Sequence, residues 1–295
     1  MARRTRPNQA LTPTQRTIVQ SKTFEGNATP QGLLDLLRPI AEFDRVGDVT
    51  RARLAKLGPA LLGGGVFAAV FLLFSELPRL LLLVSAALVL IGIACLVKAS
   101  KLSKVDLPND LRLTVLPWLS VLGEDVKPKS SIFLKLDLRG FKLPEKLVED
   151  PAQGAATAGG NAKIYLDQWM SGQAELADGA RLSWTVESRI HVDVVSRSNA
   201  RGKTKTKTKY KKKSTCVARV AFPVAYAIAL QSSNAEAKGK CRLMTEKRRP
   251  TIAVTRVVKT ANLDPMGPGA LLDAVASAYR SAKPGVAAAT AGSQT

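Results

Sequence analysis

Six lysines occupy every second position from residue 203 to residue 213, a spacing that bears directly on anion chemistry. In an extended strand, side chains at every second position share one face and lie about 6.7 Å apart. Neighbouring ammonium groups at this spacing repel by roughly 0.6 kcal/mol in bulk water, so a partner with several negative charges would relieve the repulsion. The candidate anion-binding residues are therefore Arg201, Lys203, Lys205, Lys207, Lys209, Lys211 and Lys213.

A long β-hairpin is predicted to position these lysines. Apolar and polar residues alternate between residues 181 and 194, which is typical of a strand with one buried face. Residues 199–202 then read Asn-Ala-Arg-Gly, a type I turn closed by glycine, and a three-residue loop over 200–202 sets the register. The residues predicted to lie opposite one another are Asn199 and Lys203, Asp193 and Lys209, His191 and Lys211, Val192 and Tyr210, and Ile190 and Lys212.

Three interpretations of the lysine strand remain open from the sequence. Alternating Thr and Lys can simply keep an exposed edge soluble. The lysines can instead bind an anionic membrane surface, at about 1 kcal/mol per well-placed basic residue. Nucleic acid, a nucleotide or an acidic protein would also match the charge. Stacking of nucleic-acid bases is not favoured, because Tyr210 is the sole aromatic residue of this stretch and points toward the core.

Two uncharged apolar runs, residues 57–74 and 80–97, predict a transmembrane helical hairpin. As a helix, each run spans about 27 Å, close to the thickness of a bilayer's hydrocarbon core. Small residues on the first helix would allow close packing against the second helix or against another copy of the chain. These small residues are Gly63, Gly64, Gly65, Ala68 and Ala69.

Basic residues flank the hairpin on both of its outer sides, whereas its turn carries Arg79 balanced by Glu76. The positive-inside rule therefore predicts an integral protein of the plasma or inner membrane, with both termini and the following domain in the cytoplasm. The flanking residues are Arg51, Arg53, Lys56, Lys98, Lys101 and Lys104.

The composition favours binding over catalysis. Lys and Arg number 44 against 23 Asp and Glu, and the formal net charge of +21 implies an acidic partner. The three cysteines are scattered and His191 is the sole histidine, so neither a zinc site nor a catalytic base is predicted. We expect no cofactor, no metal and no catalytic residue, and hence no enzyme.

The predicted fold is a two-helix transmembrane hairpin followed by a mainly antiparallel β domain, a sandwich or partly open barrel, with a short C-terminal helix. Residues 111–122 read as strand-like, and residues 163–169 and 173–176 as two short strands. The predicted order is a basic disordered tail (1–28), short amphipathic helices (29–56), the hairpin (57–97), the β domain (103–262), a helix (268–282) and a disordered tail (283–295).

These patterns predict a non-enzymatic, two-pass membrane protein whose basic domain is a scaffold or interaction module. Its expected partners are the membrane, in which it is integral, and an anionic lipid or an acidic protein, with nucleic acid as a further option. The alternative is a membrane effector, in which the β domain senses an anionic nucleotide-type ligand and the hairpin forms homo-oligomers that disrupt the bilayer.

Overall fold

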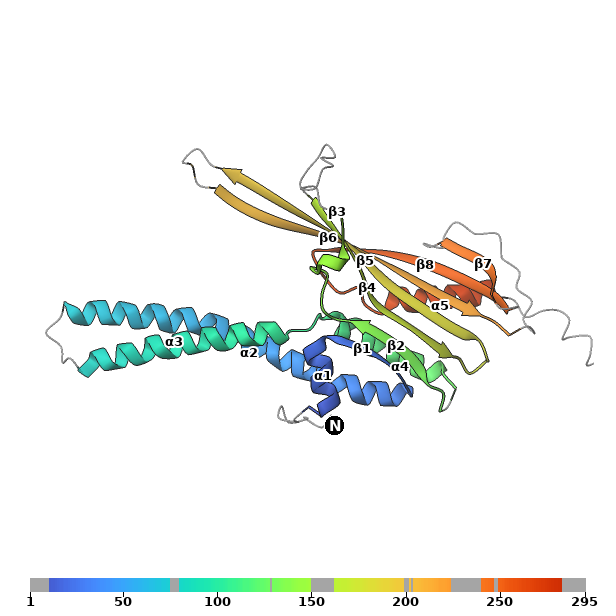
Figure 1. Cartoon of the computed structure of the whole chain (residues 1–295), viewed down its shortest axis with the longest axis horizontal. Helices are drawn as coiled ribbons and strands as arrows, with labels where there is room; N and C mark the ends of the chain where they lie inside the picture. The colour runs from blue at the N-terminus through green and yellow to red at the C-terminus, as the bar shows by residue number, and fades with distance from the viewer. Residues whose placement is uncertain are drawn as a thin grey trace, which may run out of the picture. The chain divides into compact units, whose positions relative to one another are not determined.

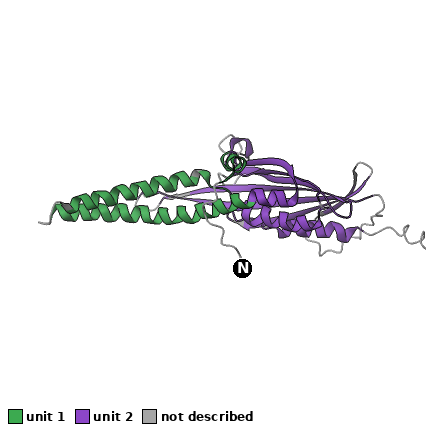
Figure 2. Cartoon of the chain, turned by 90° about the horizontal axis from the view of Figure 1, so that it is seen from below, with its two compact units in different colours: residues 1–20, 38–107 green, residues 21–37, 108–295 purple. Residues whose placement is uncertain are grey.

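The chain forms two compact units, residues 1–20 with 38–107 and residues 21–37 with 108–295 (Figure 2). The first unit contains the helical hairpin, and the second contains the sheet. The computed structural model describes residues 11–74, 80–127, 129–149, 162–198, 202, 204–223, 240–246 and 249–282.

The first described helix, α1 (Pro13–Ser21), lies where the sequence predicted a disordered tail. The Thr12 hydroxyl accepts a hydrogen bond from the Gln15 backbone N–H at 3.3 Å, and the Thr12 N–H donates to the Gln15 side chain at 2.9 Å. This reciprocal capping box satisfies two backbone donors that a helix start would otherwise leave unpaired. Disorder over all of residues 1–28 is therefore a wrong prediction.

The helix α2 (Pro30–Leu73) is continuous where separate short helices were predicted before the hairpin. The Thr29 hydroxyl caps its start by accepting from the Gly32 N–H at 3.2 Å. Pro39 lies inside α2, although an internal proline removes a backbone hydrogen bond. The buried residues Leu33, Leu37 and Ile40 continue one helical stripe past this proline, and their burial offsets its cost.

Both α2 and α3 (Leu80–Val105) are long and apolar enough to cross a membrane, by length and composition. Only 11% of the most apolar window of each helix is buried inside the protein. A core helix of a soluble protein would be mostly buried, whereas here large apolar side chains such as Phe67 and Phe74 are 75% and 90% exposed. The apolar surface of the hairpin is thus available to lipid.

The two hairpin helices approach closely along a seam of small residues. A side chain added at Gly92 would lie 2.8 Å from the Leu62 backbone N, and one at Gly65 would lie 2.8 Å from the Val89 side chain. By contrast, a side chain added at Gly63 would meet nothing within 4 Å, and the same holds for Gly64. Among the predicted packing residues, Gly65 lies in the seam, Gly63 and Gly64 face away from α3, and Ala68 and Ala69 are half-buried.

Polar contacts close the base of the hairpin within the same unit. The Asp44 carboxylate accepts a hydrogen bond from the Leu107 backbone N–H at 2.9 Å. Arg51 forms an ion pair with Asp106 and a second one, at 3.1 Å, with Asp48. The contacts of Asp44 with Leu107 and of Arg51 with Asp106 join the segment before the first apolar run to the segment after the second.

The second unit is built on one open antiparallel sheet (Figure 1). Its strand order is β1-β2-β4-β5-β6-β8-β7, and β3 pairs with β4 beside β2. The predicted hairpin, antiparallel β domain and C-terminal helix are confirmed. The strands are β1 (Thr23–Ala28), β2 (Ile132–Asp137), β3 (Leu147–Glu149), β4 (Ala162–Glu175), β5 (Arg181–Ser198), β6 (Thr204–Ala221), β7 (Lys240–Glu246) and β8 (Arg249–Ala261).

One face of the sheet carries the core of this unit. Even-numbered residues of β5 from 182 to 192 and of β6 from 212 to 220 point into it, and Trp184 packs edge-on against Trp118 of α4 (Leu116–Asp125) with ring centroids 5.5 Å apart. The C-terminal helix α5 (Gly269–Ser281) packs on β6 and β8. On the opposite face, which we call the open face, the odd-numbered side chains of β5 and β6 whose burial is described are exposed or half-buried.

Residues 111–122 are helical, so the strand-like prediction there is wrong. A π-helix, η1 (Leu111–Val115), runs directly into α4. The buried residues Leu111, Val115, Trp118 and Leu122 recur at intervals of three and four, which is a helical period. The Leu and Val residues that suggested a strand instead form the buried face of a helix packed on the sheet.

A buried lysine, Lys146, lies where the strand that pairs with β4 changes from β2 to β3. Lys146 ends a short 3₁₀ turn, η2 (Pro144–Lys146), and its ammonium lies 2.6 Å from Asp167, 3.0 Å from Asp137 and 2.9 Å from the Gly140 carbonyl oxygen. Burial raises the pKa of Asp167 against the opposing effect of Lys146. Burial also opposes ionisation of Asp137, but hydrogen bonds from Arg139 and Lys146 outweigh it and lower the pKa to about 2.

Candidate anion-binding surface

The strands β5 and β6 extend beyond their neighbours as a two-stranded ribbon (Figure 1). The pairing of β5 with β4 ends at Asp193, and the pairing of β6 with β8 ends at Lys211. Farther out, residues 194–198 pair with residues 204–208, and no other described strand pairs with either segment. We call residues 189–198 and 204–213 the lysine ribbon.

The register predicted for the ribbon is confirmed wherever it lies within the described residues. Asp193 pairs with Lys209, His191 with Lys211, Val192 with Tyr210 and Ile190 with Lys212. The predicted pair of Asn199 and Lys203 lies outside the described residues, as does Arg201. The remaining candidates, Lys205, Lys207, Lys209, Lys211 and Lys213, all lie on β6 and are exposed.

These five lysines share the open face of the sheet, because residues at every second position of one strand point the same way. Lys211 has a side chain that is 76% exposed. Lys212, one residue further on, points to the helix-covered face, where its side chain is 6% exposed and its ammonium lies 3.4 Å from Asp110. The alternation thus separates a buried, structural lysine from the exposed ones.

The open face of the ribbon carries an excess of positive charge. Asp193 lies 3.6 Å from Lys211 and is the acidic residue within the ribbon. At the base of the ribbon, Arg189, Lys213 and Lys259 form one cross-strand row over β5, β6 and β8. Sequence reasoning missed Lys259, although extending the pairing register by one strand would have found it.

The chemistry available on this surface is reversible electrostatic contact with several negative charges. The pairs that would form are solvent-exposed, so each contributes little by itself and binding depends on their number. His191 is half-buried beside Lys211. Within the described residues, no group of three or more His, Cys, Asp or Glu side chains could hold a metal ion.

Comparisons of the chain with protein-family models, with curated proteins and with solved structures give no match. The fold and the site define the class of protein by themselves: two helices long and apolar enough to span a membrane, joined to an open antiparallel sheet that carries a lysine ribbon.

Proposed function

We propose that this chain is a non-enzymatic, two-pass membrane protein whose sheet domain lies in the cytoplasm and binds anionic lipid head groups through the lysine ribbon. The observation that carries the proposal is the projecting ribbon, with five exposed lysines on one face of β6. Beyond Asp193 and Lys211 no described strand flanks the ribbon, so neighbouring strands do not obstruct Lys205, Lys207 and Lys209.

The hairpin favours lipid over other polyanions. A domain anchored by two spanning helices stays close to its own bilayer, so the local concentration of head groups is high whatever their intrinsic affinity. At about 1 kcal/mol for each well-placed lysine, four lysines supply enough energy to hold the domain against an anionic leaflet. Orientation with both termini in the cytoplasm follows from the basic flanks of the hairpin and places the ribbon on the side richer in anionic lipid.

The test uses the full chain in lipid nanodiscs and limited digestion by trypsin, which cleaves after lysine and arginine. Cleavage within the ribbon is expected to slow in discs that contain anionic lipid and to recover as salt is raised, because screening weakens exposed charge contacts. Discs of neutral lipid serve as the comparison. Equal cleavage in the two kinds of disc would overturn the proposal. Protection that appears in neutral discs only after a single-stranded oligonucleotide is added would instead identify nucleic acid as the partner.

In a variant with Lys205, Lys207, Lys209 and Lys211 all replaced by Gln, cleavage of the ribbon is expected to be no slower in anionic discs than in neutral ones. To follow its ribbon without cleavage at lysine, a digestion by a protease that does not require basic residues is run in parallel. The variant should keep the thermal unfolding midpoint of the parent, since the four side chains are exposed. A variant of Lys212, whose ammonium lies beside Asp110, provides the contrast, because its thermal unfolding midpoint should differ from that of the parent.

A further inference from the structure

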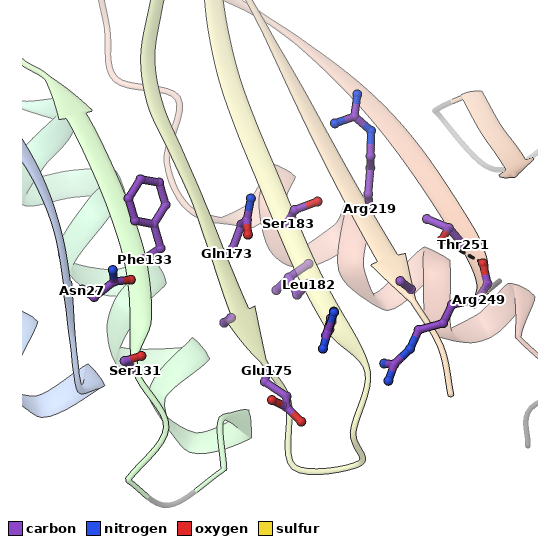
Figure 3. A pocket seen from close by; sticks show the side chains of 13 residues that line it. Asn27, Ser131, Phe133, Gln173, Glu175, Leu182, Ser183, Arg219, Arg249 and Thr251 are labelled. Carbon is purple, nitrogen blue, oxygen red and sulfur yellow. Dashed lines mark hydrogen bonds between the residues drawn. The ribbon is translucent and has the colours of Figure 1, made fainter. Parts of the chain in front are cut away.

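A second basic site lies on the same open face, toward the other ends of β5 and β6 (Figure 3). It is a depression of about 380 Å³, within the size range of small-molecule sites. Arg219 on β6 is separated from Lys213 by about 20 Å along the strand, so the two basic surfaces are distinct. We call it the arginine depression; its main lining residues are Phe133, Gln173, Arg181, Ser183, Arg219 and Arg249.

The sheet register places an aromatic, an amide, a hydroxyl and a guanidinium side chain in one row across four strands. Phe133 pairs with Gln173, Gln173 with Ser183, and Ser183 with Arg219, across β2, β4, β5 and β6. Directly paired residues share a face, and neighbouring strands lie about 4.8 Å apart. The Cα atoms of Phe133 and Arg219, three strands apart, are therefore separated by about 14 Å. An amide and a hydroxyl fill the positions between them, as Figure 3 shows.

The depression has an excess of positive charge. Arg181, Arg219 and Arg249 line it together with one acidic residue, Glu175. That carboxylate is already held by Lys127 at 2.9 Å, and this hydrogen bond, with the charges of Lys127, Arg181 and Arg249, lowers its pKa. Within the described part of the chain, Arg219 makes no ion pair, so its guanidinium is available for a bidentate contact with an anion.

We infer that the arginine depression binds a small phosphorylated ligand with a planar ring, of nucleotide type. The ring would pack on Phe133, the phosphate would bind Arg219 with support from Arg181 and Arg249, and Gln173 and Ser183 would bind polar groups between them. A guanidinium matches the geometry of phosphate oxygens, and an aromatic side chain gains from stacking with any base. The inference does not depend on lipid binding by the ribbon.

Binding is measured on the full chain in detergent micelles, by calorimetric titration with adenosine monophosphate, ribose 5-phosphate and adenosine. The monophosphate is expected to bind most tightly, since only it has both the ring and the phosphate. Equal affinity for adenosine monophosphate and ribose 5-phosphate would overturn the role of Phe133. Failure of all three to bind at millimolar concentration would overturn the site.

Two substitutions separate the parts of the site. Arg219→Gln is expected to weaken the monophosphate and ribose 5-phosphate alike, by about tenfold to a hundredfold, because both lose a charge-assisted contact. Phe133→Leu should weaken the monophosphate and leave ribose 5-phosphate unchanged. Both side chains lie on the open face, and an unchanged tryptophan fluorescence spectrum would show that the fold is kept.

The variant with Lys205, Lys207, Lys209 and Lys211 replaced by Gln is the matched control for charge. It removes four positive charges from the same face but leaves the depression intact, so nucleotide affinity is expected to stay within twofold. Loss of binding in this control, with retention in Arg219→Gln, would move the nucleotide to the ribbon and overturn the inference.

Discussion

At the scale of single residues, the ion pairs of the sheet domain differ greatly in their surroundings. Lys146 has a side chain that is 8% exposed, and its ammonium has three oxygen acceptors, one for each of its N–H groups. Lys135, which pairs with Glu25 at 2.8 Å on the open face, is 58% exposed. A buried charge that loses its partner is costly, whereas an exposed pair contributes little. The first lysine is thus structural and the second replaceable.

Lys146→Met is expected to destabilise the sheet domain by about 3–5 kcal/mol at neutral pH, because Asp167 and Asp137 lose their shared cation. Guanidinium unfolding followed by tryptophan fluorescence measures this, since Trp118, Trp169 and Trp184 all lie in the sheet unit. The loss should shrink at pH 4, where Asp167 takes up a proton more readily. Lys135→Met is the control and should cost less than about 1 kcal/mol; similar losses for the two variants would contradict this account.

Asp137 gives the domain an acid-sensitive contribution to stability. Its folded pKa of about 2 lies below the ordinary value of 3.8, so its stabilisation is complete above pH 4 and disappears as pH falls toward 2. The Asp137 side chain is 17% exposed, so solvent screening reduces this contribution to about 1–2 kcal/mol. Asp137→Asn is therefore expected to be less stable than the parent at pH 6 and equal to it near pH 2, by the same unfolding measurement. A difference that does not vary with pH would refute the assignment.

At the scale of elements, strong periodicity predicted the structure and weak periodicity did not. Alternation from residue 181 and the glycine turn specified the register of the ribbon, because a slip by one residue would turn every side chain to the other face. The predicted strands over 163–169 and 173–176 are one strand, β4, because a bulge between Gln168 and Met170 absorbs the break in alternation. The strand β1 is short and polar, and its partner β2 lies far along the chain, so local sequence could not identify it.

The candidate sites show the same division. The lysines of the ribbon could be predicted because they lie on one strand. The arginine depression draws Phe133, Ser183 and Arg219 from three strands, and such a site emerges only once the register of the whole sheet is known.

The helical hairpin permits a matched test of its seam. Gly92→Leu is expected to lower the stability of the helix pair by about 1–3 kcal/mol, because the new side chain would meet the Leu62 backbone. Gly63→Leu, on the side of α2 away from α3, is the control and should be tolerated. Energy transfer between labels on the two helices, followed during titration with a denaturing detergent, reports their separation. Equal behaviour of the two variants would place the seam elsewhere.

At the scale of the whole molecule, the sheet unit is discontinuous in sequence. The chain contributes β1 and the first turns of α2 to this unit, leaves it for residues 38–107, and returns at residue 108 to complete the sheet. Residues before the hairpin are therefore part of the domain that was predicted to lie wholly after it. A fragment that begins at residue 103 would lack the strand that covers the outer edge of β2.

Deletion of residues 2–28 is expected to cause aggregation and faster proteolysis, because β2 would then present an unpaired edge. Deletion of residues 2–22 keeps β1 and serves as the comparison, so the difference between the two variants reports the strand itself. Size-exclusion chromatography in detergent measures the aggregation. Identical elution of the two shortened chains would show that β1 is dispensable.

The pairing of Ala28 with Ile132 also has a consequence for the order of events during synthesis. The ribosome makes β1 before the hairpin and β2 after it, so this edge of the sheet cannot close until both apolar helices have emerged. If these helices enter the bilayer as they are made, insertion precedes folding of the sheet. The strand β1 then stays unpaired until β2 has been made. Because the two strands pair, they must lie on the same side of the membrane. Either both helices cross the bilayer or neither does.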